Sequence, residues 1–357
     1  MQKIKSLISV VLAFVLISTG CGYSAERHET ISEKTANNLL PSVPPFPGEN
    51  ELSEASFVEL LDQIGGNSSI NTVIVLKDSN TVQERYKYGY DKDSVVTFNS
   101  CAKSITSILI GIAIDQGLIK SIDTKISVYF PEILDDTDSR KQEITIKHLL
   151  EFTAGFDWPE WGTWNYWPGE FVSSENWVDF VLSRPMIAEP GTEFAYNTGA
   201  SQLLSAILQK ATGEDAFTFA EKNLFVPLDI QDVTWGKDPQ GITTGGFQIS
   251  MKPSDAAKIG LLYLNNGNYD GKQIVSETWV EESTQAHSQG GYFGSKYGYN
   301  WWVEDTGEVN YYYAMGYGGQ YIFIAPERNL VAVFSSNLSL QQMDLPKTYF
   351  ELLIGNA

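Results

Sequence analysis

The spacing of apolar residues changes twice along the chain, which predicts β-strands near both ends and helices between them. Near the amino end, a helix-like segment at 57–64 precedes strand-like runs at 72–76 and 82–90, with polar turn residues between the two runs. Helical spacing follows in an apolar stretch marked by Ile105, Ile108, Leu109 and Ile112, and in the segments 146–152, 175–182, 199–211 and 253–264. Strand-like runs return at 297–303, 309–314, 320–325 and 330–335, and a helix is predicted at 343–354.

This order of elements predicts an α+β fold of the α/β sandwich type. Strands from the two chain ends belong to one sheet, and the helical region between them, at about residues 101–250, is an insertion. The boundary between a sheet and such an insertion is a frequent place for a small-molecule cleft. We therefore expect functional residues where the strands and the inserted helices meet.

Composition narrows the classes of function. Hydrophobic residues make up 43% of the 357 residues, which is enough for one or two packed cores and excludes disorder as the main state. The 24 Lys and Arg residues against 44 Asp and Glu residues give a net charge of −20, which argues against nucleic-acid binding. The two cysteines and three histidines form neither a disulfide framework nor a metal-ligand spacing, so no metal site is predicted.

Residues 1–20 have the pattern of a secretory signal peptide. Lys3 and Lys5 precede an apolar stretch at 7–17, and small residues follow it. The apolar stretch is shorter than the roughly 20 residues that a membrane-spanning helix needs. The pattern therefore predicts export of the chain.

The end of this segment, Ile17-Ser-Thr-Gly-Cys21, resembles a bacterial lipoprotein signal, in which the cysteine becomes the lipidated first residue. Ser18 departs from the pattern, because a larger aliphatic residue is usual there, and ordinary cleavage is the alternative. We expect a lipid anchor at Cys21, a flexible tether at 21–51 and a folded domain at 52–357. The expected location is secreted or extracytoplasmic, with membrane contact through the lipid alone.

Ser100 and Lys103 form an S-x-x-K tetrad at the start of the most apolar predicted helix. Three residues apart on a helix, the two side chains share a face, so the amine can reach the hydroxyl. The unpaired N–H groups at a helix start also favour negative charge on a reacting oxygen. A serine needs a base, and lysine serves as one where burial disfavours its charged form. The alternative is a helix-capping Ser100 beside a solvated Lys103.

The tetrad belongs to the first of several segments that occur in order along the chain. They include Phe98-Asn-Ser-Cys-Ala-Lys103, Ile144-Thr-Ile-Lys-His-Leu-Leu150, Pro190-Gly-Thr-Glu-Phe-Ala-Tyr-Asn197, Ser250-Met-Lys-Pro-Ser-Asp255, Tyr297-Gly-Tyr-Asn-Trp-Trp302 and Ala314-Met-Gly-Tyr-Gly-Gly-Gln320. Together they resemble the penicillin-recognising serine hydrolases, and within them the class C β-lactamase-like esterases and amidases that include 6-aminohexanoate-dimer hydrolase. The resemblance runs from about Phe57 to the carboxyl end. It implies a β-lactamase/DD-peptidase-like fold with an antiparallel sheet, and it implies no metal or organic cofactor.

The resemblance implies that Ser100 is the nucleophile, Lys103 its proton-transfer partner and Tyr196 a second one. A phenol can serve if the adjacent ammonium of Lys103 stabilises its phenolate form. The family's second motif commonly reads Tyr-x-Asn, whereas this chain has Tyr196-Asn197-Thr198, which puts the substrate contacts of that amide in doubt. The alternative for Tyr196 is a packed aromatic ring ahead of a helix.

The third motif of β-lactamases, Lys-Thr-Gly, corresponds here to Ala314-Met315-Gly316 and lacks a basic residue. Because that lysine helps to hold the β-lactam carboxylate, its absence argues against efficient penicillin hydrolysis. The resemblance implies an oxyanion hole formed by the backbone N–H groups of Ser100 and Tyr317, each contributing about 3 kcal/mol. If the register is shifted, the second donor is the backbone N–H of Gln320. The alternative interpretation of Gly316, Gly318 and Gly319 is a tight turn between two strands, with no part in catalysis.

An aromatic run at 158–167 contains Trp164, Tyr166 and Trp167. We expect these three residues to cover the substrate, because the family has a loop of that kind in this stretch and aromatic side chains can wall an apolar pocket. Packing of the insertion onto the sheet is the alternative.

The sequence thus predicts a serine hydrolase that cleaves a small-molecule ester or amide, or a peptide, through an acyl-enzyme on Ser100. A DD-peptidase and a weak β-lactamase are the alternatives within the same class. A non-catalytic extracytoplasmic binding module is the alternative of another class, although such a module has no reason to keep Ser100, Lys103 and Tyr196 together.

Overall fold

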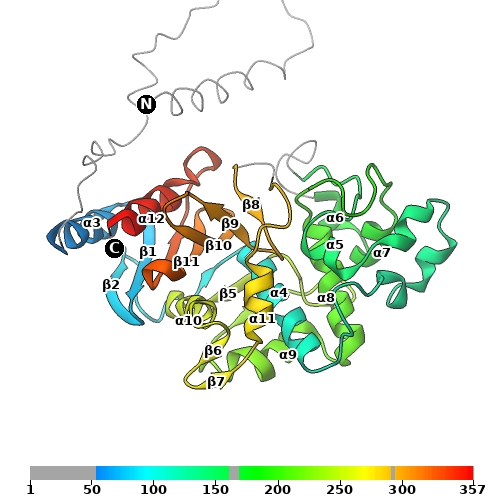
Figure 1. The fold of residues 1–357 in the computed structure, drawn as a ribbon, viewed down its shortest axis with the longest axis horizontal. Helices are drawn as coiled ribbons and strands as arrows, with labels where there is room; N and C mark the ends of the chain where they lie inside the picture. Colours follow the sequence, from blue (N-terminus) through cyan, green and yellow to red (C-terminus); the bar gives the residue numbers. More distant parts are fainter. Residues whose placement is uncertain (1–53, 161–168, 291–293, 357) are drawn as a thin grey trace, which may run out of the picture. The chain divides into compact units, whose positions relative to one another are not determined.

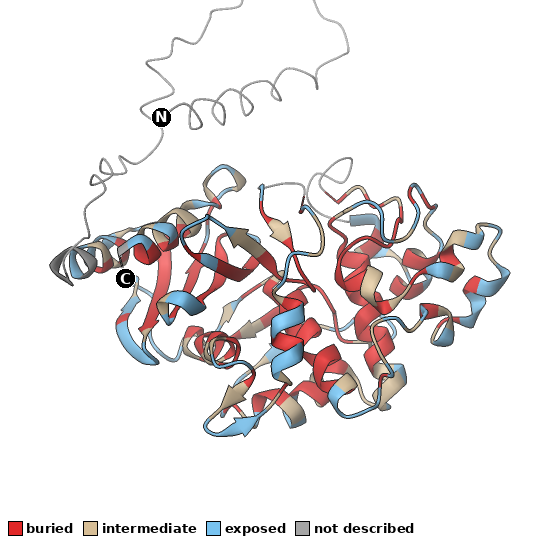
Figure 2. Ribbon diagram, in the orientation of Figure 1, coloured by how far each residue is buried: buried red, intermediate tan, exposed pale blue. Residues whose placement is uncertain are grey.

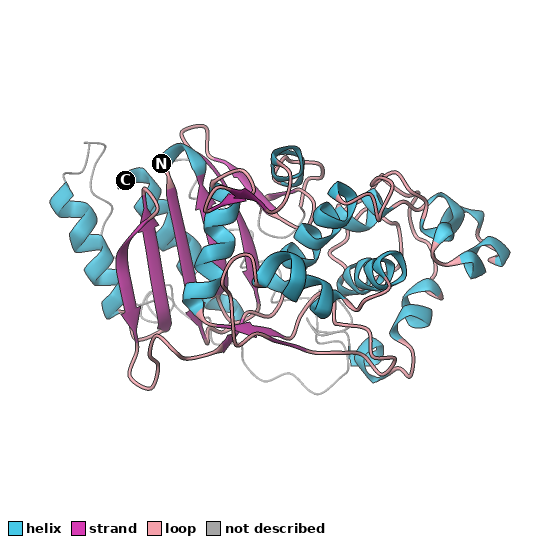
Figure 3. Ribbon diagram, turned by 90° about the horizontal axis from the view of Figure 1, so that it is seen from below, coloured by secondary structure: helices cyan, strands magenta, loops and turns pink. Residues whose placement is uncertain are grey.

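The computed structural model describes residues 54–160, 169–290 and 294–356. An antiparallel sheet lies at one side of this part of the chain, and a mostly helical region lies beside it (Figure 3). The order of the strands is β2 (Asn80–Tyr86), β1 (Ile70–Lys77), β12 (Leu330–Ser336), β11 (Gln320–Ala325), β10 (Asn310–Gly316), β9 (Trp302–Asp305) and β8 (Lys296–Tyr297). Because β1 pairs with β12, both chain ends build one sheet, as predicted.

Helices cover both faces of this sheet. On one face, α3 (Glu54–Gly66) and α12 (Leu345–Asn356) pack against each other and against the strands, and α10 (Pro253–Leu264) packs on the other face (Figure 1). Every residue of β11 and β12 is buried. Strands buried on both faces appear in a sequence as continuous apolar runs. The coverage therefore explains why 320–325 and 330–335 carry so few polar residues.

The helix α4 (Cys101–Asp115) runs through the centre of the domain and is buried from Cys101 to Ala113. Figure 2 shows that buried residues are concentrated in the sheet and in the helices beside it. The polar side chains of α4 are bonded to neighbouring loops: Ser104 Oγ donates to the carbonyl of Asn300 at 2.7 Å, and Thr106 Oγ1 to that of Gly245 at 2.7 Å. These bonds fix α4 against the insertion and against the carboxyl-terminal part of the chain.

Shorter elements complete the domain. The helices are α5 (Ile146–Leu150), α6 (Gly169–Ser173), α7 (Trp177–Leu182), α8 (Thr198–Thr212), α9 (Ala216–Ala220) and α11 (Glu277–Ser283). A second sheet has the order β3 (Val96–Thr97), β5 (Ile249–Met251) and β4 (Thr234–Trp235), and β6 (Asn268–Tyr269) pairs with β7 (Lys272–Gln273). The helices α4 to α9 all lie between β3 and β5 in the sequence.

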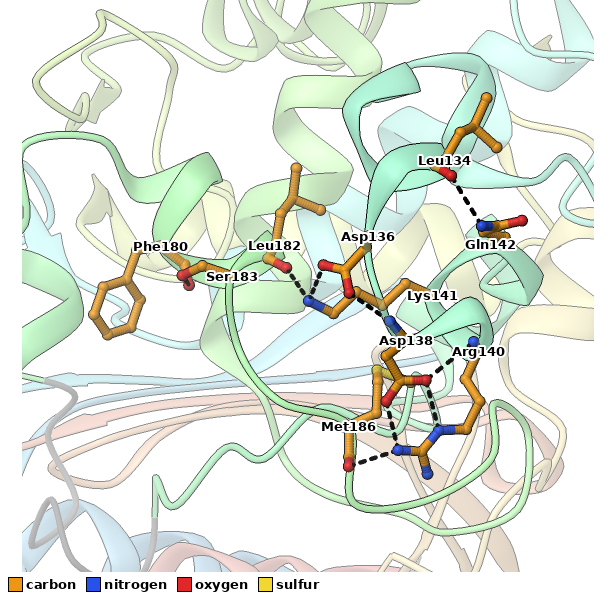
Figure 4. Close-up of polar contacts among 10 residues, drawn as sticks. All are labelled: Leu134, Asp136, Asp138, Arg140, Lys141, Gln142, Phe180, Leu182, Ser183 and Met186. Carbon is orange, nitrogen blue, oxygen red and sulfur yellow. Dashed lines mark hydrogen bonds and ion pairs between the residues drawn. The ribbon is translucent and has the colours of Figure 1, made fainter.

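A cluster of polar contacts connects residues 131–143 of the insertion to the end of α7 and to the segment that follows it (Figure 4). Lys141 is 4% exposed, and its amine donates to Asp136 Oδ2 at 2.6 Å and to the carbonyl of Leu182 at 2.8 Å. Arg140 binds both oxygens of Asp138, at 2.9 and 2.6 Å, and donates to the carbonyl of Met186 at 3.0 Å. The cluster joins 131–143 to the segment that follows α7.

The prediction of one strand at 297–303 was wrong. The structure has two short strands there, β8 and β9, which pair with each other around a turn. Asn300 in that turn has a positive φ of 60°, and its backbone N–H and Nδ2 donate to the carbonyl of Leu150 at 3.0 and 2.6 Å. Aromatic residues favour strands locally, but these buried hydrogen bonds to a distant helix end require the chain to turn.

Residues Glu51–Ala357 form one compact unit. In the described ranges, every helix is too short or too polar to span a bilayer. The predicted signal peptide at 1–20 and tether at 21–51, with the lipidation site Cys21, lie outside the described residues.

Candidate active site

Ser100 stands at the N-cap position of α4, between the small second sheet and the end of β10. The residue before it, Asn99, has a positive φ of 48°, and its Nδ2 donates to the carbonyl of Tyr317 at 2.7 Å. The backbone N–H of Phe98 donates to the carbonyl of Ile249 at 2.9 Å. The Ser100 hydroxyl makes no capping bond to the helix, which removes the capping alternative. The turn therefore presents a half-buried hydroxyl that other side chains can reach.

Lys103 is 1% exposed, so it is not the solvated residue of the alternative interpretation. Its Nζ lies 3.1 Å from Ser100 Oγ and 2.9 Å from the carbonyl oxygen of Gly246. Burial lowers the pKa of Lys103 to about 8. A neutral amine has two N–H groups and one lone pair, so it can donate to Gly246 and accept the proton of Ser100.

Tyr196 is 5% exposed and shares a hydrogen bond with Ser100. Lys103 Nζ lies 4.9 Å from the centre of the Tyr196 ring, and the ring stacks on Trp302 with 5.8 Å between centroids. Burial raises the pKa of Tyr196 well above its usual value, while the bond to Ser100 acts in the opposite direction. The structure thus brings three exchangeable protons, on Ser100, Lys103 and Tyr196, into one buried group.

The glycine at the end of β10 lies directly against the turn that holds Ser100. A Cβ at Gly316 would lie 2.2 Å from the carbonyl oxygen of Phe98 and 3.1 Å from the backbone nitrogen of Ser100, so only glycine allows this approach. Tyr317 follows Gly316, and its side chain is 55% exposed. Gln320 instead pairs with Gly316 across the β10–β11 turn, and its buried side chain donates to the carbonyl of Ser336 at 2.7 Å.

The aromatic run at 158–167 is described only as far as Glu160. Trp164, Tyr166 and Trp167 lie outside the described residues. Trp158, at the start of the same run, is buried, and its ring meets those of Phe171 and Phe180 edge-on, at 5.3 and 6.3 Å between centroids. This end of the run therefore packs the insertion.

The sequence analysis missed Glu160, a carboxylate that is 6% exposed. It accepts hydrogen bonds from the backbone N–H of Thr198 at 2.7 Å, from Thr198 Oγ1 at 2.5 Å and from Trp158 Nε1 at 2.9 Å. Its charge acts on both Lys103 and Tyr196. In the sequence, Glu160 can be recognised only as a single acidic residue within the aromatic run at 158–167. The carbonyl of Gly246 was missed as well, because a backbone acceptor has no signature in a sequence.

Comparisons with known proteins find similarity over most of the chain. The model of the family described as Beta-lactamase matches residues 58–355. The chain is 24% identical to 6-aminohexanoate-dimer hydrolase of Paenarthrobacter ureafaciens over 87% of this chain and 83% of that protein.

Two solved structures share the fold. A putative 6-aminohexanoate-dimer hydrolase from Bacillus anthracis has a TM-score of 0.69 at 21% identity and covers 83% of this chain and 81% of its own. EstCE1, described as a hydrolase with promiscuous acyltransferase activity, has a TM-score of 0.70 at 17% identity and covers 84% and 98%.

Proposed function

The chain belongs to the beta-lactamase family of serine hydrolases, and we propose that it cleaves a small ester or amide through an acyl-enzyme on Ser100. The observation that carries the proposal is the contact of 3.1 Å between Ser100 Oγ and the amine of Lys103, which is buried and has a pKa of about 8. A lysine in water is a poor base at neutral pH, whereas burial gives Lys103 an available lone pair in a larger share of molecules, although the protonated form still predominates.

The proposed reaction has two halves. In acylation, the Ser100 proton passes to the neutral amine of Lys103, either directly or through Tyr196, which gives its own proton to that amine as it takes the one from Ser100. At the same time Oγ bonds to the carbonyl carbon and the C=O electron pair moves to oxygen. Collapse of this intermediate re-forms the C=O bond, breaks the bond to the alcohol or amine, and transfers the proton to that leaving group. A water molecule then attacks the acyl-enzyme in the same way, so the products are a carboxylic acid and restored Ser100.

The developing oxyanion needs two hydrogen-bond donors. We assign them to the backbone N–H groups of Ser100 and Tyr317, because Gly316 allows the end of β10 to lie against the nitrogen of Ser100. Gln320 is the weaker candidate, since it lies across the turn and is a paired residue of β11.

The substrate is proposed to have an uncharged acyl group. In a β-lactamase the strand that corresponds to β10 carries a lysine that binds a carboxylate of the substrate. This chain has Ala314 and Met315 at the corresponding positions, and both are buried. One relative is named for hydrolysis of a 6-aminohexanoate dimer and one solved structure for acyltransferase activity, whereas two relatives that match about two fifths to half of the chain are named a penicillin-binding protein and a D-alanyl-D-alanine carboxypeptidase. A linear amide or a simple ester is therefore favoured over a β-lactam or a D-alanyl peptide.

The test is covalent labelling of Ser100. Wild-type protein is incubated with a fluorophosphonate probe, and its intact mass is compared with that of Ser100→Ala, while release of nitrophenol from p-nitrophenyl esters is followed in parallel. We expect one adduct and ester turnover in wild type and neither in Ser100→Ala. If the variant matches wild type, the hydrolase proposal fails and the binding-module alternative is favoured.

A second assay separates the substrates. Short esters, linear amides, a D-Ala-D-Ala peptide and nitrocefin are compared by kcat/KM against Ser100→Ala. We expect nitrocefin to be the poorest substrate, and turnover of nitrocefin comparable to that of the esters would contradict the inference drawn from Ala314.

The protein is further proposed to be exported and lipid-anchored at Cys21. The support is the sequence of residues 1–21 alone.

A further inference from the structure

The loop 158–160 is fastened to the first turn of α8, directly after Tyr196. The Trp158 indole occupies the place of a side chain at Gly199, where a Cβ would lie 2.5 Å from the ring. Glu160 accepts two hydrogen bonds from Thr198 and one from Trp158. The carboxylate is therefore held in one position relative to α8 and to the catalytic tyrosine two residues before Thr198.

Thr198 connects this carboxylate to the catalytic amine. A Cβ at Gly246 would lie 3.1 Å from Lys103 Nζ and 3.2 Å from Thr198 Cγ2, so the lysine amine and the Thr198 side chain converge on one point. The hydroxyl on that same side chain donates to Glu160 at 2.5 Å. Glu160 thus lies one side chain away from Lys103, and all three residues, with Thr198 between them, are buried.

The partners of Glu160 satisfy its hydrogen bonds without neutralising it. All three donors, two from Thr198 and one from Trp158, are uncharged groups. A buried negative charge acts over several ångströms, because the surroundings screen it much less than water does. It favours the ammonium form of Lys103 and disfavours the phenolate form of Tyr196.

We propose that Glu160 is a positioning residue of the catalytic centre, whose negative charge keeps the Lys103–Tyr196 pair protonated at rest and so sets the pH above which Ser100 is activated. The proposal rests on the proposed function of Ser100. The groups that face the pair are Ser100 and Cys101 at the start of α4, Glu160 in its loop, Tyr297 of β8 and the carbonyl of Gly246. Glu160 is the acid among these groups.

The direction of the effect follows from the charge. Burial lowers the pKa of Lys103, and Glu160 opposes that shift. Glu160 also adds to the raised pKa of Tyr196. Removal of its charge lowers both pKa values, so the pH profile moves toward acid whichever of the two groups takes the Ser100 proton.

Glu160→Gln removes the negative charge but keeps groups that can form the same hydrogen bonds. The glutamine carbonyl can accept from the Thr198 N–H and Trp158 Nε1, and its amide can donate to Thr198 Oγ1, so each bond has a counterpart. The rate of Ser100 labelling by a fluorophosphonate is measured from pH 5 to 10. We expect a midpoint near 8 in wild type and a midpoint roughly one pH unit lower in Glu160→Gln.

Two matched variants test the alternatives. Glu143→Gln removes one negative charge from an exposed pair with Lys125 and should leave the midpoint of wild type. Thr198→Ala removes the hydroxyl but keeps the charge of Glu160, so it should also retain that midpoint, even if it lowers the melting temperature. An acid shift in this variant would show that the hydroxyl contact, and not the charge of Glu160, sets the midpoint.

The outcomes are distinguishable. If wild type is labelled but Glu160→Gln has the same midpoint, or if Thr198→Ala shifts the midpoint toward acid, then Glu160 acts only through packing and this inference is overturned. If wild type is not labelled at Ser100 at all, the proposed function itself fails.

Discussion

Two buried lysines in this chain show how the partner of a residue decides its chemistry. Lys141 is 4% exposed and contacts the carboxylate of Asp136 at 2.6 Å, an arrangement that stabilises its charge. Lys103 is 1% exposed and contacts only neutral oxygens, those of Ser100 and Gly246, among the described residues. The pKa of Lys103 is lowered because burial disfavours the ammonium form, and the two oxygens that contact it carry no negative charge to offset that effect. One lysine therefore stabilises the fold, and the other can transfer protons.

The role of the Tyr196 hydroxyl can be separated from that of its ring. Tyr196→Phe keeps the stack on Trp302 but removes the bond to Ser100. Because a positioned proton-transfer group typically contributes 10²–10⁴-fold, we expect kcat/KM for p-nitrophenyl esters to fall by roughly that factor. The melting temperature should change little.

Tyr86→Phe is the matched control, since it removes a tyrosine hydroxyl that bonds Glu84 in the edge strand β2. An equal loss of activity in both variants would mean that the Tyr196 hydroxyl has no special part in the reaction.

At the scale of elements, the start of α4 and the end of β10 define the site together. Asn99 donates to the carbonyl of Tyr317, and Gly316 lies against Ser100 with no room for a side chain. The proposed nucleophile and the proposed oxyanion donor therefore lie at one junction between a helix and a strand.

Gly316→Ala should disrupt this junction. The added methyl group would meet the carbonyl oxygen of Phe98 at 2.2 Å, so the backbone must move. A misplacement of about 1 Å can cost roughly 100-fold in rate, and we expect a loss of that size in the rate of Ser100 labelling. Gly66→Ala, at a position in α3 with no atom within 4 Å of the new methyl group, should label at the wild-type rate. Equal rates for both variants would refute the tight approach.

The cluster around Lys141 stabilises the insertion rather than the chemistry. Lys141→Met leaves the carboxylate of Asp136 without its partner, and we expect the free energy of unfolding to fall by about 3 kcal/mol. Lys125→Met breaks a pair whose side chains are 48% and 64% exposed, and should cost less than about 1 kcal/mol. Urea denaturation gives both values, and a cost for Lys141→Met no larger than that for Lys125→Met would contradict the assignment.

At the scale of the whole molecule, the chemistry and the predicted anchor belong to separate parts of the chain. All the proposed catalytic residues lie between 100 and 317, whereas the predicted lipid site is Cys21. The hydrolase domain should therefore work without the anchor, and the anchor should decide only where it works.

This separation can be tested in bacteria grown with a labelled fatty acid. We expect wild-type protein to take up the label and to sediment with membranes, because an anchor that carries two or more acyl chains holds a protein stably on a bilayer. Cys21→Ala should lose the label while its folded domain keeps ester turnover. A wild-type protein without label would favour ordinary cleavage of the signal peptide.

Much of the fold followed from local pattern. The strands at 320–325 and 330–336 and the helix at 253–264 are visible as apolar runs or helical spacing, and their bounds differ little from the prediction. The segment 297–303 did not follow its local pattern, because Asn300 bonds a carbonyl at the end of α5, 150 residues earlier. Local propensity cannot report a bond of that range.

The site shows the same division. The reactive residue types could be read from the chain, because Ser100 and Lys103 are one helical turn apart and share a face. Only the tertiary structure decided that the lysine is buried, that Asn99 reaches Tyr317 across 218 residues, and that Glu160 is held beside the pair by Thr198. The physical reason is that a pKa depends on burial and on charges that are near in space. Spacing along the chain contains neither.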